Sequence, residues 1–397
     1  MKTTPYENEG GIIHCEMKNY ADVYVNKMNE ENKRMKRIFS FLIILSLMLS
    51  TAVSANASEN DIDGHWAKPY IEELNAQDIM HGNGSGLYRP NDSITRAEFA
   101  TMVNKAFGFV EDKGNTFTDV KTADWYAKEI SIAVTQGYLS GIGNRKAAPA
   151  ANLTREQSAV IIGRIMKLTA GTNKTNFNDD GRISIWAREM VAAVAEEGYI
   201  KGSNGSFRPG DNIARGEAAT IIAHAVGDLY NQAGAYDGAG QVMSGNVTIS
   251  VADVTLKNMT INGNLYITEG VGDGTAVLDG VTVKGKTLIS GGGVNSVIII
   301  NTQLGPVTID VPDGSPVRFT AQGNSSVDSI LVASDEVTLE SGQTIKTTII
   351  AIPEGASIDL KGSFGTVEVQ TPGCSIKAKD ASIAELVVAA TATDAQI

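Results

Sequence analysis

Three arginines recur at nearly equal spacing in the first half of the chain. Arg96, Arg155 and Arg215 lie 59 and 60 residues apart, each at the start of a predicted helix. A cation there faces the positive end of the helix dipole, at a cost of about 0.3–1 kcal/mol. A guanidinium beside exposed helix amides could bind an anion, and a planar carboxylate above all. The alternative is a salt bridge from each arginine to a neighbouring copy of the repeat.

The arginines belong to a unit that occurs three times. The three tryptophans of the chain, a set of glycines and a set of prolines repeat with the same spacing: Trp66, Trp125 and Trp186; Gly82, Gly141 and Gly202; Pro90, Pro149 and Pro209. Apolar residues at helical spacing flank a glycine-rich loop, which predicts a helix, a loop and a second helix. Three such units can bury their apolar faces jointly.

A capping box explains part of the second helix's first turn. Thr95 and Glu98 occupy its two positions in the first copy, and Thr154 and Gln157 occupy them in the second. The hydroxyl accepts a hydrogen bond from a helix amide, and the longer side chain reaches back. The third copy has Ala214 in place of the threonine. The capping box accounts for Thr and Glu but leaves the arginine unexplained.

The motifs of the three copies form a recognisable pattern. The first copy contains Asp61-Ile62, Gly64-His65-Trp66-Ala67, Tyr88-Arg89-Pro90 and Ile94-Thr95-Arg96-Ala97-Glu98. The second contains Phe117-Thr118-Asp119-Val120 and Leu153-Thr154-Arg155, and the third contains Phe177-Asn178-Asp179, Phe207-Arg208-Pro209 and Arg215-Gly216-Glu217. This unit resembles the S-layer homology (SLH) domain, and residues 59–230 resemble a tandem of three. The departures are Glu59, Lys146-Ala147-Ala148-Pro149 and the missing third threonine.

The resemblance implies a three-pronged assembly around a central helical bundle, which holds proteins on bacterial walls. The implied ligand is a peptidoglycan-linked secondary cell-wall polysaccharide, often with a pyruvylated sugar whose carboxylate suits the arginines. The residues that it implies in grooves between the prongs are Arg96, Arg155, Arg215, Gly82, Gly141, Gly202, Trp66, Trp125, Trp186, Asp61, Asp119 and Asp179. Arg96 and Arg155 are the stronger candidates. Core or prong packing is the alternative for each tryptophan, and helix capping for each aspartate.

The first 57 residues have the order of a secretory signal peptide. Basic residues at 33–37 precede an apolar run from Ile38 to Val53, and small residues follow up to Ala57. This pattern predicts cleavage between Ala57 and Ser58. A retained signal anchor is the alternative, although the apolar run is shorter than the roughly 20 residues that span a membrane. Residues 1–27 form an upstream extension, and Met28 and Met35 are alternative starts.

The composition changes near residue 235, where short β-branched runs replace the helical pattern. Two series of such runs, punctuated by glycines, repeat about every 20 residues, beginning at Val254 and Leu265. This period predicts a right-handed parallel β-solenoid of six or seven coils. A β-sandwich is the alternative. An exposed solenoid end would favour self-association or an unknown protein partner.

Catalysis by the second half is not expected. β-Helix polysaccharide lyases and hydrolases need acids and bases that converge on one face. The aspartates here are scattered, and several lie beside glycine or proline, as turn residues do: Asp253, Asp273, Asp279, Asp310 and Asp313. Arg318 lies in a predicted strand without an acidic partner in its own repeat.

Charge and composition limit the partners. The net charge of −12 argues against a broad nucleic-acid surface. Two cysteines and four histidines do not predict a disulfide framework or a Cys/His metal site. We therefore expect no metal and no cofactor.

The sequence thus predicts a multidomain, exported bacterial surface protein that is anchored non-covalently to anionic wall polysaccharide. The predicted parts are the export segment (1–57), three SLH repeats (58–111, 112–171 and 172–230), a flexible linker (231–241) and the solenoid (242–397), a scaffold or presentation domain. The alternatives are a wall-anchored polysaccharide-degrading enzyme and a self-assembling S-layer component.

Overall fold

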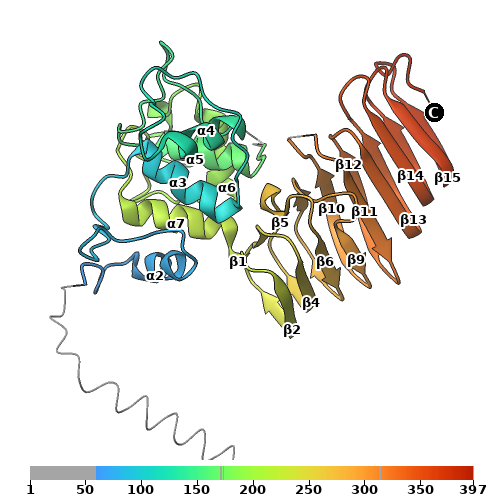
Figure 1. Ribbon diagram of the computed structural model, residues 1–397, viewed down its shortest axis with the longest axis horizontal. Coiled ribbons are helices and arrows are strands. Elements are labelled where there is room, and N and C mark those ends of the chain that lie inside the picture. The colour runs from blue at the N-terminus through green and yellow to red at the C-terminus, as the bar shows by residue number, and fades with distance from the viewer. Residues whose placement is uncertain (1–59, 170–171, 173, 313, 397) are drawn as a thin grey trace, which may run out of the picture. The chain divides into compact units, whose positions relative to one another are not determined.

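A computed structural model describes residues 60–169, 172, 174–312 and 314–396. The predicted signal peptide and its cleavage site between Ala57 and Ser58 lie outside the described residues. Within residues 60–396, a helical part is followed by a long row of strands (Figure 1).

Each repeat of the helical part contributes two helices, as the apolar periodicity predicts. The first helices are α2 (Lys68–Ala76), α4 (Ala127–Thr135) and α6 (Arg188–Glu196), and a short 3₁₀ turn, η1 (Asp180–Arg182), precedes α6. The second helices are α3 (Arg96–Phe107), α5 (Arg155–Ile165) and α7 (Arg215–Val226). The second helices each bury seven to nine residues, so they supply most of the helical core.

The three repeats close on one another in a ring. Ile94 donates its amide to Ile213, Ile213 donates to Leu153, and Leu153 donates to Ile94, over 2.9–3.1 Å. All three side chains are fully buried. Helix packing follows the same cycle, because α3 packs on α4, α5 on α6, and α7 on α2. Each repeat therefore buries its apolar faces against both of the others.

The second part is a parallel β-solenoid of about eight turns. Its strands are β1 (Asp228–Tyr230), β2 (Gly234–Met243), β3 (Val247–Ile249), β4 (Val254–Ile261), β5 (Leu265–Ile267), β6 (Ala276–Asp279), β7 (Thr282–Val283), β8 (Thr287–Ile289), β9 (Ile298–Ile300), β10 (Gln303–Ile309), β11 (Val317–Gln322), β12 (Ser326–Val332), β13 (Val337–Ile350), β14 (Ser357–Val369) and β15 (Ser375–Val388), with a 3₁₀ turn η2 (Glu269–Val271). Every strand pair between them is parallel.

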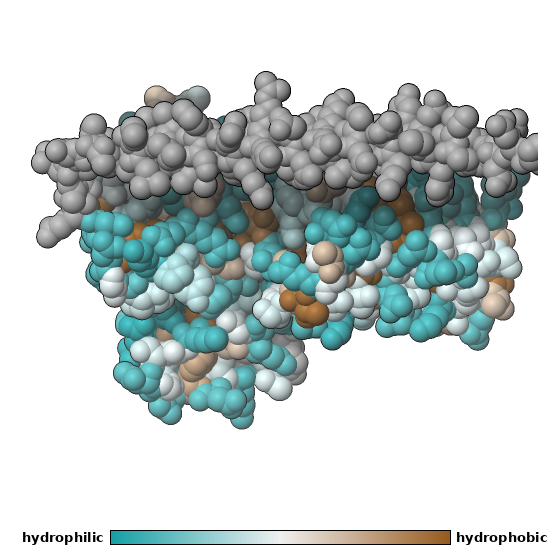
Figure 2. All heavy atoms as spheres, turned by 90° about the horizontal axis from the view of Figure 1, so that it is seen from below, coloured by the Kyte–Doolittle hydropathy of each residue, from teal (hydrophilic) through white to brown (hydrophobic). Residues whose placement is uncertain are grey.

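The two series of β-branched runs predicted from the sequence form stacked ladders. Val254 pairs with Ala276 in one ladder, and Leu265 pairs with Thr287 in the other. Inward side chains stack in register, as Phe319, Leu339 and Leu360 do, and all three are fully buried. The interior is therefore a continuous apolar core. On the face shown in Figure 2, hydrophilic residues predominate and apolar residues form small patches.

The segment 231–241, expected as a flexible linker, is largely ordered strand. β2 pairs with β4, and β1, just before it, pairs with β3. The small residues Gly238 and Ala239 accommodate an irregularity where the register of β2 shifts. The solenoid thus begins near residue 228, which explains why it has more turns than the six or seven expected.

Polar contacts join the last helix and loops of the helical part to the first solenoid turns. The Tyr199 and Tyr266 hydroxyls lie 3.0 Å apart, and Asn246 donates to Tyr199. Thr248 donates its hydroxyl to the carbonyl of Val226 over 2.7 Å. Because these side chains are buried, the two parts share one interior at this junction.

Candidate functional site

Each predicted arginine begins a core helix and reaches into the next repeat. The three side chains are only 5%, 3% and 8% exposed, in the order Arg96, Arg155 and Arg215. Each donates from Nε and Nη2 to two backbone carbonyls: Arg96 to Ala147 and Ser140, Arg155 to Phe207 and Lys201, and Arg215 to Tyr88 and His81. Burial lowers the pKa of all three guanidinium groups. The arginines are therefore part of the contact between repeats.

The helix amides beside these arginines are not exposed, which corrects the expectation of an amide-lined anion site. The amides of Arg96 and Ala97 donate to the carbonyls of Ala151 and Pro149 over 2.9–3.0 Å. The other two helices repeat this arrangement with the following copy. In each repeat, the loop that contains Pro90, Pro149 or Pro209 turns two carbonyls toward a neighbouring core helix. These carbonyls accept hydrogen bonds from the first two amides of that helix.

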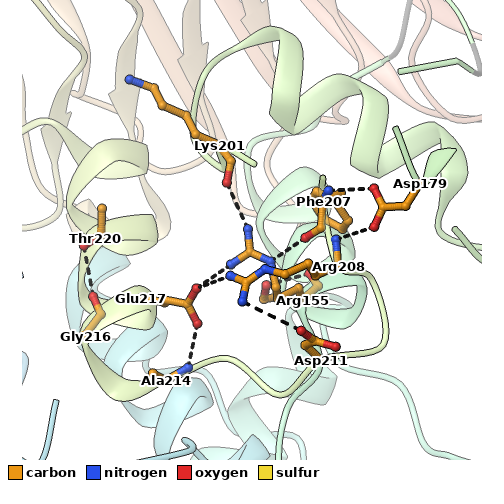
Figure 3. A network of polar contacts seen from close by, with 11 residues as sticks. Arg155, Asp179, Lys201, Phe207, Arg208, Asp211, Ala214, Gly216, Glu217 and Thr220 are labelled. Atoms are coloured by element: carbon orange, nitrogen blue, oxygen red, sulfur yellow. Dashed lines mark hydrogen bonds and ion pairs between the residues drawn. The ribbon is translucent and has the colours of Figure 1, made fainter. Parts of the chain in front are cut away.

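Two of the three arginines form the salt bridge that was the alternative interpretation. Arg155 Nη1 lies 2.8 Å from Glu217, and Arg215 Nη1 lies 3.0 Å from Glu98 (Figure 3 shows the first). The glutamates are the third residues of the neighbouring core helices. Gln157 holds that position opposite Arg96, which forms no ion pair within the described part of the chain.

The three predicted aspartates hold loops in place. Each accepts two backbone amides with its two carboxylate oxygens: Asp61 from Tyr88 and Arg89, Asp119 from Ala147 and Ala148, and Asp179 from Phe207 and Arg208. Partial burial opposes ionisation of Asp119 and Asp179, but these amides hold the pKa of both carboxyls below the ordinary value. Each loop held by an aspartate also contains a carbonyl that accepts a hydrogen bond from one of the three arginines.

The three tryptophans are exposed. Their exposed fractions are 58% for Trp66, 66% for Trp125 and 58% for Trp186. The alternative of a core tryptophan is therefore wrong. Each lies just before the first helix of its repeat, where its ring is available to a ligand.

The three predicted glycines lie where the backbone turns against itself. A Cβ on Gly141 would come within 2.7 Å of the Phe117 ring and 2.9 Å of the Lys146 carbonyl. A Cβ on Gly202 would meet Phe177 and Ser206 at 2.5 and 2.8 Å, and one on Gly82 would meet Gly86 at 2.9 Å. Only glycine fits at these positions without movement of the loop.

Two grooves each bring together predicted residues from all three repeats, whereas Arg155, Gly202 and Trp66 line neither groove. Groove A has a volume of about 420 Å³ and is lined by Arg96, Gly141, Gln157, Arg164 and Trp186 together with apolar residues of α5. Groove B has a volume of about 380 Å³ and is lined in the same way by Arg215, Gly82, Glu98, Lys105 and Trp125. The predicted aspartates are not among the lining residues of either groove.

Sequence reasoning missed the basic residue at the end of each core helix. Lys105 and Arg164 line their grooves from the same face as Glu98 and Gln157. The repeat register held the signal, since these two residues and His224 occupy equivalent positions. Burial lowers the pKa of His224.

The solenoid aspartates that were weighed for catalysis do not converge within the described residues. Asp253 lies at a positive φ of 62° and accepts from Thr275 in the next turn. Asp310 pairs with Lys167 at the junction. Arg318 does have an acidic partner, Glu340, one turn further on rather than in its own repeat. Asp313 lies outside the described residues.

Other kinds of site find no support in the part of the chain that the structure describes. It contains no cluster of three or more residues suited to holding a metal ion. Its one cysteine, Cys374, is buried and free. No helix among residues 60–396 has the length and apolar character to cross a bilayer.

Comparison with known proteins matches the helical repeats directly. The family model of the S-layer homology domain matches residues 60–100, 116–159 and 176–219. The chain contains three SLH domains. Each match includes one of the tryptophans, one of the motif aspartates and the helix-starting arginine that reaches into the next SLH domain.

Several curated proteins resemble the chain. A surface-layer 125 kDa protein of Lysinibacillus sphaericus is 25% identical over 94% of this chain and 31% of its own length. A cellulosome-anchoring protein of Acetivibrio thermocellus is 30% identical over 36% of this chain and 34% of its own length. An amylopullulanase of Thermoanaerobacterium thermosulfurigenes is 38% identical over 41% of this chain and 9% of its own length, a similarity confined to the SLH part. The chain covers about a third or less of each of these relatives.

Proposed function

We propose that the SLH domains anchor this chain to the bacterial cell surface by binding an anionic wall polysaccharide. The SLH domains and the surface-layer relative indicate a secreted, cell-wall-anchored surface protein. The observation that carries the proposal is the grooves, in which a buried arginine and an exposed tryptophan from different repeats meet.

The chemistry of the grooves suits an acidic sugar. The face of a tryptophan ring packs against the apolar face of a sugar ring, while the indole N–H remains in contact with water. A guanidinium binds a planar carboxylate through two parallel hydrogen bonds. A pyruvylated sugar presents both features, so a pyruvylated secondary polysaccharide is the ligand that we propose.

The solenoid serves as a scaffold or presentation domain without catalysis. Its interior is filled with apolar side chains, and Asp253, Asp310 and Arg318 are engaged separately in a turn and in ion pairs. The relatives with enzyme names match only the SLH part of this chain. We therefore expect no release of products from uronic-acid polymers.

The test uses the intact chain from residue 58 onward, because buried contacts at Tyr199, Asn246 and Tyr266 join its two parts. The chain is sedimented with purified wall sacculi before and after acid extraction of their secondary polymer. We expect co-sedimentation that extraction abolishes. Binding that survives extraction, or the absence of binding to untreated sacculi, would contradict the proposal.

Assembly into a surface array is a second candidate function. The similarity to the surface-layer protein of L. sphaericus extends over 94% of this chain, and so includes the solenoid. Electron microscopy of the purified chain on sacculi would test this. Ordered lattices support an S-layer component, whereas scattered single particles support anchoring alone.

A further inference from the structure

Groove A and groove B have the same construction, but their basic side chains differ in whether they are paired with carboxylates. Groove A is lined by Arg96 and Arg164 and by no acidic residue. Groove B is lined by Arg89, Lys105 and Arg215, and by Glu98. The difference lies in which of these cations already has a carboxylate.

Every lysine and arginine that lines groove B has a carboxylate partner. Arg215 pairs with Glu98 at 3.0 Å, Lys105 with Asp78 at 3.2 Å, and Arg89 with Asp92 at 3.6 Å. A ligand carboxylate entering groove B would compete with these carboxylates for the cations.

The third arginine, Arg155, is in the same condition as Arg215. Its Nη1 lies 2.8 Å from Glu217, which also accepts from Arg208 at 3.1 Å (Figure 3). Arg208 has a second acidic neighbour, Asp211, at 3.7 Å. One glutamate and one aspartate therefore already serve both guanidinium groups.

In groove A neither cation has a carboxylate partner among the described residues. Arg96 uses Nε and Nη2 for the carbonyls of Ala147 and Ser140, which leaves Nη1 without a hydrogen bond in the described part of the chain. Arg164 donates only to the Ser140 hydroxyl at 3.1 Å and, more weakly, to the Tyr138 carbonyl at 3.4 Å. A buried guanidinium with a free donor favours an incoming anion.

Besides Gly137, which stands where the first repeat has Asp78, the carboxylate partner of Lys105, two departures of the second repeat produce this difference. Gln157 stands where the other repeats have Glu98 and Glu217, and Ala148 stands where they have Arg89 and Arg208. The first exchange removes the carboxylate that would neutralise Arg96. The second removes the basic side chain that shares this carboxylate in the third repeat. The remaining pair, Arg96 and Arg164, lies in the same groove as the exposed Trp186.

We propose that groove A is the carboxylate-binding groove of this chain, and that Gln157 determines this selectivity. The inference rests on the proposed function and names the groove and the residue that serve it. The ligand group is a sugar-borne carboxylate, held between Arg96 and Arg164 with its ring against Trp186. The glutamates of the other two sites act as built-in competitors for the same guanidinium donors.

The decisive variant is Gln157→Glu in the intact chain. It gives groove A the carboxylate that Glu217 offers to Arg155, at a position where two repeats already fold with glutamate. Gln232→Glu adds the same charge at an exposed site outside the grooves and serves as the control. The probes are a pyruvylated monosaccharide and its methyl ester, measured by titration calorimetry, and purified sacculi, measured by co-sedimentation.

We expect Gln157→Glu to weaken binding of the pyruvylated sugar about 10- to 100-fold, the range for a charge-assisted hydrogen bond. The control should keep the affinity of the parent chain, and the methyl ester should bind weakly to all three proteins. If Gln157→Glu lowers the thermal midpoint, Arg164→Gln replaces it, since Arg164 is exposed, and about a tenfold loss is expected.

Two results would overturn the inference while leaving wall anchoring by the SLH domains intact. One is undiminished binding of sacculi and sugar by Gln157→Glu and Arg164→Gln. The other is equal affinity of the parent chain for the acid and its methyl ester. Failure of the parent chain to bind sacculi at all contradicts the proposed function itself, so the two failures are distinguishable.

Discussion

The SLH domains and the solenoid join their repeats in different ways. The SLH domains close in a ring whose contacts are polar as well as apolar, with a buried guanidinium at each interface. The solenoid stacks its turns in an open row around an apolar interior, and Arg318 forms its ion pair away from the core. Grooves lined by polar groups therefore arise between SLH domains, while the solenoid interior has stability as its main role.

The largest effect that we expect concerns the ring. Arg155→Ala leaves the carbonyls of Phe207 and Lys201 without their buried donor, and Glu217 keeps Arg208 as its only cation among the described residues. Breaking a buried ion pair from one side costs about 3–5 kcal/mol. Chemical denaturation followed by tryptophan fluorescence measures this loss. Lys128→Ala, at an exposed position, is the control and should change the free energy of unfolding by less than about 0.5 kcal/mol.

This expectation changes how the arginines can be tested. Alanine at Arg96 or Arg155 removes contacts between repeats as well as any contact with a ligand. Loss of wall binding in such variants would therefore not separate folding from recognition. A loss of less than about 1 kcal/mol for Arg155→Ala would show that the ring does not depend on this side chain.

The second effect concerns the solenoid core. Leu339→Ala removes a side chain that stacks between Phe319 and Leu360 and is fully buried. A cavity of this kind costs about 2–5 kcal/mol. The free energy of unfolding should fall by this amount, while binding to sacculi at 25 °C stays unchanged. Thr338→Ala, one residue away and partly exposed, should cost less than about 1 kcal/mol; loss of sacculus binding by folded Leu339→Ala would contradict the division of roles.

Much of this fold follows from the repeats in the sequence. The 59–61-residue spacing of tryptophans, glycines and arginines and the roughly 20-residue spacing of β-branched runs each predict a structural unit, and both units are confirmed. Segment 231–241 was harder to predict, because small residues are typical of flexible linkers. Its strand forms through pairing with β4, a partner that local composition does not reveal.

The site was predicted in composition but only partly in mechanism. Arg96 lines a groove with Trp186 and Arg215 lines one with Trp125, but the helix amides beside the arginines are occupied. That occupation depends on carbonyls of another repeat, across the ring, which no local pattern specifies. The sequence identified Gln157 only as a capping residue. Its position opposite Arg96 depends on how the repeats are arranged in the ring, which the sequence does not show.

The third effect concerns recognition rather than folding. Trp186→Ala should weaken binding to sacculi about tenfold, because groove A would lose the exposed aromatic ring that it offers to a sugar. Its exposure of 58% means that stability should change by less than about 0.5 kcal/mol. Trp125→Ala is the matched exchange in groove B and tests whether the grooves are equivalent. A larger loss with Trp125→Ala than with Trp186→Ala would assign recognition to groove B.

The smallest effect that we expect concerns the junction between the SLH domains and the solenoid. Tyr266→Phe removes a hydroxyl that lies 3.0 Å from that of Tyr199 and accepts from Asn264 at 3.2 Å. The ring stays in the shared core, so only the hydrogen bonds are lost, at a cost of about 1 kcal/mol. Tyr230→Phe, at a partly exposed ring nearby in the solenoid, is the control. Hydrogen exchange of the β5 amides should increase in Tyr266→Phe alone, if the SLH domains and the solenoid support each other at this junction. Unchanged hydrogen exchange would mean that apolar packing, and not the pair of tyrosine hydroxyls, couples the SLH domains to the solenoid.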